Sequence, residues 1–360
     1  MKLRHFETLQ PICPTCRDDK IDQQFSLKLT TTLKQENDHV LEGILNCSNP
    51  DCLREYPIID GIPIIVSRIR SYISENLSSI DARDDLEAVT ESIVGDCCGP
   101  NSSFETIRQQ LSSYAWDHYA EFDPEESFSR YRPSSAVGIL EEALARAGEI
   151  AAGPIIEVGS SVGRTSFELA QRYGELVLGI DLNFSMLRLA SRALRCGIVR
   201  YPRRRVGVVY DRREFPVSFV NDENVDFWAC DAAALPFQDN TFSLAVSLNT
   251  LDCFYSPVDS LSSISRVLKS GGCALITCPY DWSSSATPVE SWLGGHSQRG
   301  SNRGVSAEVL RALLMPGAQP QTIKGLELRS EIDGLEWNVR MHERCTVAYN
   351  VHAVIAEAVQ

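Results

Sequence analysis

The chain has 360 residues, 43% of them hydrophobic and 23% charged, which is the composition of a folded globular protein large enough for more than one domain. Its 34 basic and 48 acidic residues give a formal charge of −14, and this negative charge disfavours non-specific binding to nucleic acids. The first ten residues lack the apolar core of a signal peptide, and no run of about 20 apolar residues is present, so we expect a cytoplasmic protein without a membrane span.

Four cysteines near the N-terminus have the spacing of a metal site. Cys13 and Cys16 form a C-x2-C pair, and Cys47 and Cys52 form a C-x4-C pair thirty residues further on. Two such pairs on tight turns can surround a zinc ion with four thiolates, and the ion then replaces the hydrophobic core that about sixty residues can barely build. We therefore predict a β-rich zinc ribbon over residues 1–66, with four unrelated thiols as the alternative interpretation.

The same segment resembles a known small protein. Residues 13–66, which contain CPTC and YPIIDGIP, resemble the zinc-ribbon activator subunit of tRNA and protein methyltransferases. The resemblance implies a structural zinc ion and a surface that can bind a protein partner. It implies nothing about catalysis.

The rest of the chain divides into a polar segment and a long segment of alternating patterns. Residues 67–113 are serine-rich and acidic with helical stretches, so we expect a helical connector there. From residue 114 onward strand patterns alternate with helical ones, and the strand candidates are PIIEV, LVLGI, VDFWA, FSLAVSL and CALITC. This alternation predicts a parallel, doubly wound α/β sheet, and we assign residues 114–360 to it.

A glycine-containing turn follows the first of these strands and opens a helix. At Gly159 and Gly163 the absence of a side chain lets a ligand approach the backbone N–H groups at the helix start. Asp181 ends the next strand, about twenty residues on, where a carboxylate can accept both ribose hydroxyls of a nucleoside. After the third strand, Asp231 can accept from the exocyclic amine of adenine and Ala232 leaves room for the ring. The order predicts a site for a nucleoside cofactor.

These elements, together with DAAALPF after the third strand, resemble class I S-adenosylmethionine-dependent methyltransferases over residues 114–358. The resemblance implies a Rossmann-like fold and S-adenosylmethionine as the cofactor. Glu157 matches the acidic residue of the family's first motif, Gly159 and Gly163 match its glycines, and Ser161 replaces its middle glycine. A dinucleotide-binding oxidoreductase is the structural alternative, and the DAAALPF element favours methyl transfer.

Polar and aromatic residues follow the fourth and fifth strands. Because ligands of open α/β sheets bind beyond the carboxyl ends of the strands, we expect Asn249, Asp252 and Tyr280 to face the transferred methyl group. Asp252 is the candidate to accept the N–H of an imidazole, which leaves the lone pair on the other ring nitrogen. Asn249 would bind the cofactor and orient the reactants, and Tyr280 and Trp282 would enclose the ring. The alternative is that Asp252 caps a helix and that the two aromatic residues belong to the core.

Several motifs resemble the methyltransferase domain of ovothiol biosynthesis, which methylates the imidazole of a thiohistidine. They are PYDW at 279–282, TP at 287–288, WLGG at 292–295, the insertion with RYP at 200–202 and the tail at 337–349. The N-x-x-D element formed by Asn249 and Asp252 is also shared by histidine-methylating protein methyltransferases. The resemblance implies N-methylation of a histidine-derived small molecule or of a peptide.

Eight arginines form a basic stretch that contains a single acid, Asp211. They are Arg192, Arg195, Arg200, Arg203, Arg204, Arg205, Arg212 and Arg213. Such a stretch can bind RNA phosphates, anchor a substrate carboxylate, or form a solvated insertion. A zinc ribbon before this catalytic fold also resembles rRNA guanine methyltransferases, so RNA base methylation is a second hypothesis, although the net charge disfavours it. A third is a non-catalytic scaffold that has lost the cofactor, which Ser161 supports.

Overall fold

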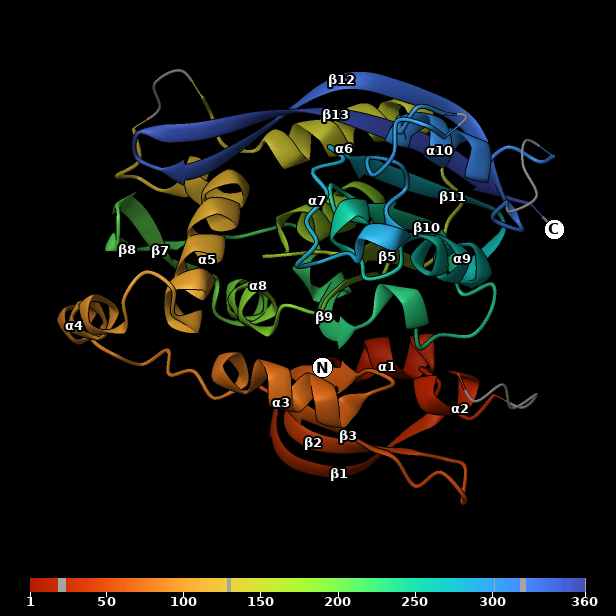
Figure 1. Cartoon of the computed structure of the whole chain (residues 1–360). Helices are drawn as coiled ribbons and strands as arrows, with labels where there is room; N and C mark the ends of the chain where they lie inside the picture. Colours follow the sequence, from red (N-terminus) through yellow and green to blue (C-terminus); the bar gives the residue numbers. More distant parts are fainter. Residues whose placement is uncertain (19–23, 128–130, 301, 318–321, 360) are drawn as a thin grey trace.

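The computed structural model describes residues 1–18, 24–127, 131–300, 302–317 and 322–359. A parallel sheet stands at its centre, with the strand order β9-β6-β5-β10-β11. These strands are β5 (Ile155–Val158), β6 (Val177–Asp181), β9 (Val225–Cys230), β10 (Phe242–Ser247) and β11 (Leu268–Cys278). Nearly every residue of β5, β6, β9 and β10 is buried, as expected when helices cover both faces of a parallel sheet. The predicted doubly wound α/β fold is confirmed (Figure 1).

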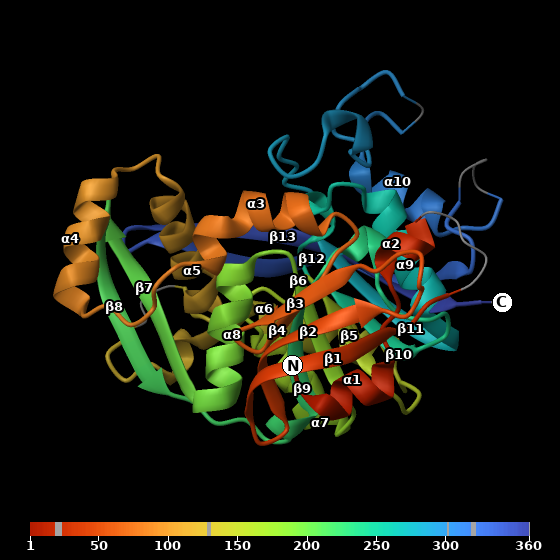
Figure 2. The ribbon, with the colours of Figure 1, turned by 90° about the horizontal axis from the view of Figure 1, so that it is seen from below.

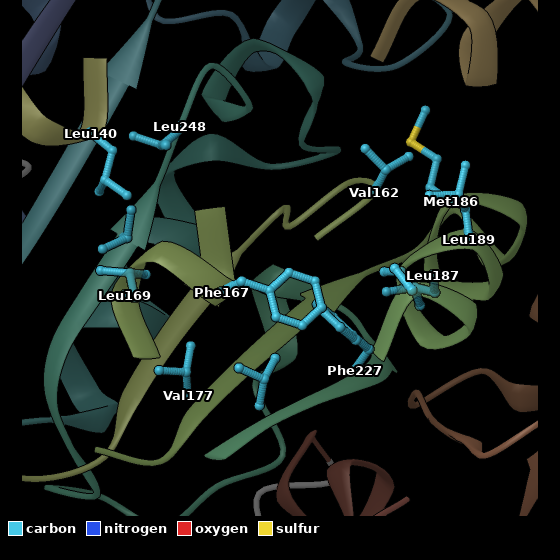
Figure 3. Close-up of a cluster of buried hydrophobic side chains, with 14 of the residues drawn as sticks. Leu140, Val162, Phe167, Leu169, Val177, Met186, Leu187, Leu189, Phe227 and Leu248 are labelled. Atoms are coloured by element: carbon cyan, nitrogen blue, oxygen red, sulfur yellow. The ribbon is translucent and has the colours of Figure 1, made fainter. Parts of the chain in front are cut away.

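Helices cover the two faces of this sheet. The first face carries α6 (Ser135–Ala147), α7 (Arg164–Tyr173) and α8 (Phe184–Cys196), and the second carries α9 (Pro257–Val267) and α10 (Ser306–Leu313). Figure 3 shows the core of the first face, where the Phe167 ring of α7 meets the Phe227 ring of β9 edge-on at 5.7 Å between centroids. Local signals fix the helix ends: the Asn183 side chain accepts from the Met186 N–H at the start of α8, and Gly197 ends it in the left-handed region.

The N-terminal strands continue the central sheet. They are β1 (Leu27–Glu36), β2 (His39–Cys47), β3 (Glu55–Ile59) and β4 (Ile62–Ile65), preceded by α1 (Leu3–Leu9) and α2 (Pro14–Asp18). The four strands form an antiparallel meander, and β4 pairs in parallel with β9, so that one sheet of eleven strands runs from β1 to β12. Figures 1 and 2 show the meander beside the parallel strands. The segment expected to form a zinc ribbon therefore shares backbone hydrogen bonds with the central parallel sheet.

Helices follow the meander, as the polar composition of residues 67–113 suggests. They are α3 (Ile69–Ile80), α4 (Ala88–Cys98) and α5 (Ser103–Tyr119). The Ser102 side chain caps α5 by accepting from the Glu105 N–H at 3.1 Å. This helix runs past residue 114, where we expected the second domain to begin, and it packs against β7 and β12.

Two antiparallel hairpins complete the fold. β7 (Ile198–Val206) and β8 (Val209–Pro216) form a separate two-stranded sheet, which contains most of the arginine-rich stretch. β12 (Leu326–His342) and β13 (Cys345–Ala358) form a long hairpin whose second strand pairs with β11. In the described part of the chain no helix has both the length and the apolar character that crossing a membrane requires.

Candidate active site

A cavity of about 240 Å³ lies at the carboxyl ends of β5, β6, β9 and β10, and α5 contributes to its wall. Six of the eight residues predicted to bind the cofactor line it: Gly159, Ser161, Asp181, Asp231, Ala232 and Asn249. Gln110 and Tyr114 of α5, and Cys253, Phe254 and Tyr255 after β10, also line it. The predicted position, beyond the carboxyl ends of the strands, matches the cavity that the structure contains.

The turn after β5 has the backbone conformation that its residues suggest. Gly159 has φ +81°, and a Cβ there would lie 2.4 Å from Cγ2 of Thr250, so only glycine fits. Ser161, which replaces the family's middle glycine, also adopts a positive φ of +52°. Its N–H donates to the Asp181 carboxylate at 2.8 Å, which holds this strained conformation in place.

The Asp181 carboxylate joins the turn to the start of α8. One oxygen accepts from the Ser161 N–H and the other from the Asn183 N–H, both at 2.8 Å. Burial raises the pKa of Asp181, while these backbone donors lower it. Each carboxylate oxygen keeps a further lone pair, so both can still accept from ribose hydroxyls. Asp231 is similar, because one of its oxygens accepts from the Ala233 N–H at 2.9 Å.

Two predicted cofactor residues, Glu157 and Gly163, are not among the described residues that line the cavity. Glu157 is 1% exposed, and its oxygens accept from the Thr165 and Ser166 hydroxyls, so it fastens β5 to α7. Burial raises the pKa of Glu157 to about 7. A Cβ at Gly163 would lie 2.6 Å from the Phe227 ring, which makes this glycine a packing position. The sequence motif that contains Glu157 and Gly163 therefore predicts the position of the turn. It does not predict that these two residues contact the protein interior.

Of the three predicted catalytic residues, only Asn249 lines the cavity. It has φ +54°, and its side-chain oxygen accepts from the Thr277 hydroxyl at 2.8 Å. Asp252 is not among the described residues that line the cavity: its side chain is buried at 2% exposure, and Oδ2 accepts from the Asp281 N–H at 2.6 Å. Burial raises the pKa of Asp252. Its carboxylate joins the loop after β10 to the loop after β11, a contact between loops that one sequence does not reveal.

The aromatic residues of the loop after β11 face elsewhere as well. The Tyr280 hydroxyl lies 2.7 Å from Nδ1 of His352, on β13, and the ring is not among the described lining residues. The Trp282 indole donates to the Ser306 hydroxyl at 3.0 Å and stacks on Trp292 at 6.0 Å between centroids. For these two residues the structure supports the alternative, a role in packing.

Other residues near the cavity were missed by sequence reasoning. Tyr349 of β13 donates from its hydroxyl to Oδ2 of Asp281 at 2.8 Å, and its ring stacks on Trp337 at 5.2 Å between centroids. Trp337 in turn lies 6.3 Å from Tyr114, which lines the cavity. The tail at 337–349 was singled out only through a resemblance, and no local pattern connects it with the loop of Asp281.

The four predicted metal ligands come together. The Sγ atoms of Cys13, Cys16, Cys47 and Cys52 all lie within 4.8 Å of one another. Asn49 donates from its side chain to Cys16 and from its backbone to Cys47, both at 3.4 Å, which are the contacts that thiolates accept. Four sulfur donors at these separations fit a tetrahedral zinc ion.

The arginine-rich stretch is neutralised inside the protein. Seven of its eight arginines lie within 4.0 Å of a carboxylate: Arg192, Arg195, Arg200, Arg203, Arg205, Arg212 and Arg213. The partners come from several elements, such as Asp123 for Arg213 and Glu91 for Arg212. Paired arginines offer little attraction to RNA phosphates.

Known proteins support a methyltransferase domain. Residues 156–276 match the family model described as a methyltransferase domain. A sterol 24-C-methyltransferase from Gibberella zeae is 25% identical over 205 residues, which are 56% of this chain and 46% of that protein, so the chain spans about half the length of the curated relative it matches.

Solved structures resemble the chain only weakly. Phosphoethanolamine N-methyltransferase 2 from Haemonchus contortus, in complex with S-adenosyl-L-methionine, is 22% identical over 50% of this chain and 34% of that one, with a TM-score of 0.34. A chain in the complex of the Trm112 methyltransferase activator from Haloferax volcanii is 15% identical over 63% of this chain and 92% of that one, with a TM-score of 0.39. At these values the similarities carry no argument about the methyl acceptor.

Proposed function

We propose that this chain, whose residues 156–276 form an S-adenosylmethionine-dependent methyltransferase domain, methylates an imidazole-like nitrogen of a histidine-derived small molecule or peptide. The observation that carries the proposal is the contact chain from Tyr349 through Asp281 to Asp252, which ends beside the cavity residue Cys253. This chain of contacts supports an acceptor site at which an exposed carboxylate and aromatic rings lie beside the cofactor cavity.

The cavity supplies the groups that S-adenosylmethionine needs. Asp181 accepts from the ribose hydroxyls, and Asp231 with Ala232 faces the adenine edge. The turn at Gly159 and Ser161 brings the backbone close to the rest of the ligand. When bound, S-adenosylmethionine supplies an electrophilic methyl group on its sulfonium sulfur.

Asp281 is the residue that we assign to the acceptor. Its side chain is exposed, Tyr349 donates to Oδ2, and no hydrogen bond to Oδ1 is found among the residues that the structure describes. An imidazole that donates its N–H to Oδ1 keeps the lone pair on its other nitrogen, where it can attack the methyl group. The carboxylate then stabilises the positive charge that develops on the alkylated ring. Asp252 acts through Asp281, as a positioning residue.

A row of aromatic side chains that begins at Tyr349, the partner of Asp281, suits such an acceptor. Tyr114, Trp337 and Tyr349 form a continuous row of rings with centroids 6.3 Å and 5.2 Å apart. A flat ring that becomes cationic during the reaction is favoured beside aromatic faces. RNA base methylation has less support, because the arginines proposed to bind phosphates pair with carboxylates of the same chain.

The test is a screen of radiolabelled methyl transfer from S-adenosylmethionine onto histidine, thiohistidine, histidine-containing peptides and RNA. We expect transfer to a histidine derivative or peptide, and a fall in turnover of roughly two orders of magnitude or more in Asp281→Asn, because a positioned proton acceptor is lost. S-adenosylmethionine affinity should not change in this variant. The matched control is Asp96→Asn, an exposed carboxylate on α4. Transfer to RNA alone, or full activity of Asp281→Asn, would contradict the proposal.

A further inference from the structure

We propose that a second pocket, apart from the cofactor cavity, binds a small amphipathic anion, meaning an apolar body that carries one carboxylate or phosphate group. The pocket has a volume of about 210 Å³ and lies between the segment at 78–91, α5, α8 and the β7–β8 hairpin. None of its described lining residues lines the cofactor cavity. Its contents therefore do not compete with the cofactor for space.

The inner wall of this pocket is apolar. Phe104, Ile107 and Leu111 project from successive turns of α5, and Leu189 of α8 and Leu86 add to the same wall. Phe104, Ile107, Leu111 and Leu86 are partly exposed rather than buried, as expected for side chains that border an open pocket. Such a wall favours an aliphatic or aromatic ligand of small size.

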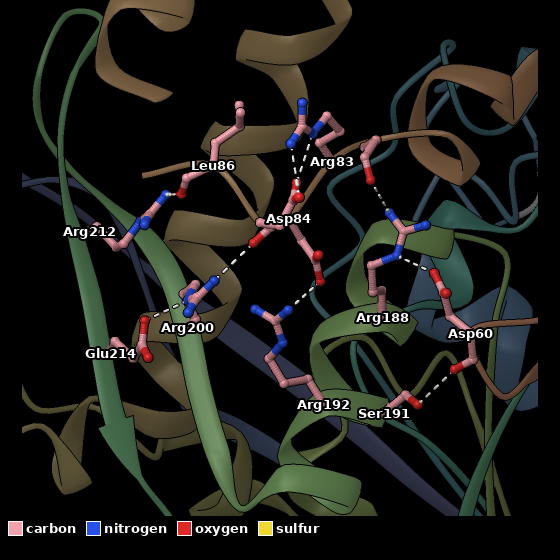
Figure 4. A network of polar contacts seen from close by, with 12 residues as sticks. Asp60, Arg83, Asp84, Leu86, Arg188, Ser191, Arg192, Arg200, Arg212 and Glu214 are labelled. Carbon is pink, nitrogen blue, oxygen red and sulfur yellow. Dashed lines mark hydrogen bonds and ion pairs between the residues drawn. The ribbon is translucent and has the colours of Figure 1, made fainter. Parts of the chain in front are cut away.

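The rim of the pocket is rich in arginine, but most of these arginines are paired with carboxylates. Six arginines line it, against two carboxylates, Asp84 and Glu91. Figure 4 shows most of this rim. Five of the arginines have a carboxylate within 4.0 Å: Arg83 with Asp85, Arg188 with Asp60, Arg192 with Asp84, Arg200 with Glu214, and Arg212 with Glu91.

Arg108 is the sixth, and it has no carboxylate partner within 4.0 Å in the described ranges of the chain. Its side chain is buried, with 6% of the residue exposed, and its Nε makes no hydrogen bond to any described residue. The guanidinium lies over the Tyr210 ring, 4.0 Å from the centroid, and over Phe104. Glu105, three residues earlier, accepts from the Tyr210 hydroxyl and from Gln109 through Oε1, and neither of its oxygens lies within 4.0 Å of the Arg108 guanidinium, although Oε2 is buried without a hydrogen-bond partner among the described residues.

A buried guanidinium without an anionic partner is costly, and an anionic ligand removes that cost. The planar fork of arginine matches a carboxylate or a phosphate group in two parallel hydrogen bonds. The apolar wall formed by Ile107 and Leu111 then covers the rest of the ligand. The apolar wall and the unpaired Arg108 together indicate a ligand that is an amphipathic anion.

The probe for the test is 8-anilinonaphthalene-1-sulfonate, an amphipathic anion whose fluorescence rises in apolar surroundings. The full chain is first saturated with S-adenosylhomocysteine, so that the cofactor cavity is blocked. We expect saturable binding of one probe per chain, displaced by octanoate or octyl phosphate but not by octylammonium, which has the same apolar body and the opposite charge. The relative potency of octanoate and octyl phosphate distinguishes a carboxylate from a phosphate ligand.

Arg108→Met should weaken probe binding at least tenfold, whereas Arg146→Met, an exposed arginine on α6, should not. Ile107→Trp keeps Arg108 and fills the pocket, so it should also block the probe, and it replaces the first variant if that one loses its cooperative thermal transition. The proposal is overturned if no saturable binding occurs, if octylammonium displaces the probe as well as octanoate does, or if the folded variants bind like the original chain.

Discussion

Replacing Asp181 tests the assignment of the cofactor cavity most directly. In Asp181→Ala a ligand loses a charged acceptor for its ribose hydroxyls, a contact typically contributing about 1.5–3 kcal/mol. Since each 1.4 kcal/mol is a factor of about ten, the dissociation constant should rise about 10- to 150-fold. The Ser161 and Asn183 N–H groups, now 2.8 Å from the carboxylate, also lose their acceptor, so the melting temperature should fall as well.

Asp181→Asn separates these two effects. An amide keeps one acceptor oxygen, so it can hold either the Ser161 or the Asn183 N–H but not both. The stability loss should therefore be smaller than in Asp181→Ala, while the cofactor affinity falls by a similar factor because the charge is gone. Isothermal titration with S-adenosylhomocysteine and thermal unfolding measure both quantities, and Asp96→Ala serves as the exposed control. Unchanged affinity in a folded Asp181→Ala variant would show that the ligand binds elsewhere.

Three further changes test other parts of the structure. Elemental analysis should find one zinc per chain. The Cys13→Ser variant should bind no zinc, and hydrogen exchange should become faster in its strand β4, which pairs with β9. A metal-free chain that stays fully folded would contradict this prediction. Because burial raises the pKa of Glu157 from 4.5 to about 7, the folded state keeps a proton that the unfolded chain releases. Stability should therefore fall as the pH rises from about 4.5 to about 7, by up to about 3 kcal/mol. Glu157→Gln should flatten this pH dependence in chemical denaturation, and an unchanged slope would refute the assignment. Asp252→Asn keeps an acceptor for the Asp281 N–H, so turnover should fall less than about tenfold, whereas Asp252→Ala should lower turnover further. A fall in turnover of about two orders of magnitude in Asp252→Asn would instead show that Asp252 takes part directly in catalysis.

The sequence by itself determined the elements whose signals are local. The runs at Ile155–Val158 and Val225–Cys230 are mostly apolar and buried throughout because helices cover both faces of the sheet, so their pattern predicts buried parallel strands. The turn at Gly159 directly follows the first of these strands, the carboxylate at Asp181 ends β6, and the four cysteines come in pairs. Each of these features depends on neighbours within a few residues, which is why the cavity and the cysteine cluster lie where the patterns indicate.

The tertiary structure alone decided which side chains meet across the fold. The Asp252 carboxylate accepts from a residue 29 positions later, and Tyr349 reaches Asp281 from 68 positions away. The pairing of β4 with β9 and the carboxylate partners of the arginine-rich stretch also join distant segments. A carboxylate or an arginine in a sequence carries the same charge whether it faces a ligand, solvent or an ion-pair partner. Only the packing of separate elements determines which of these it meets, and therefore whether it binds a ligand or holds two loops together.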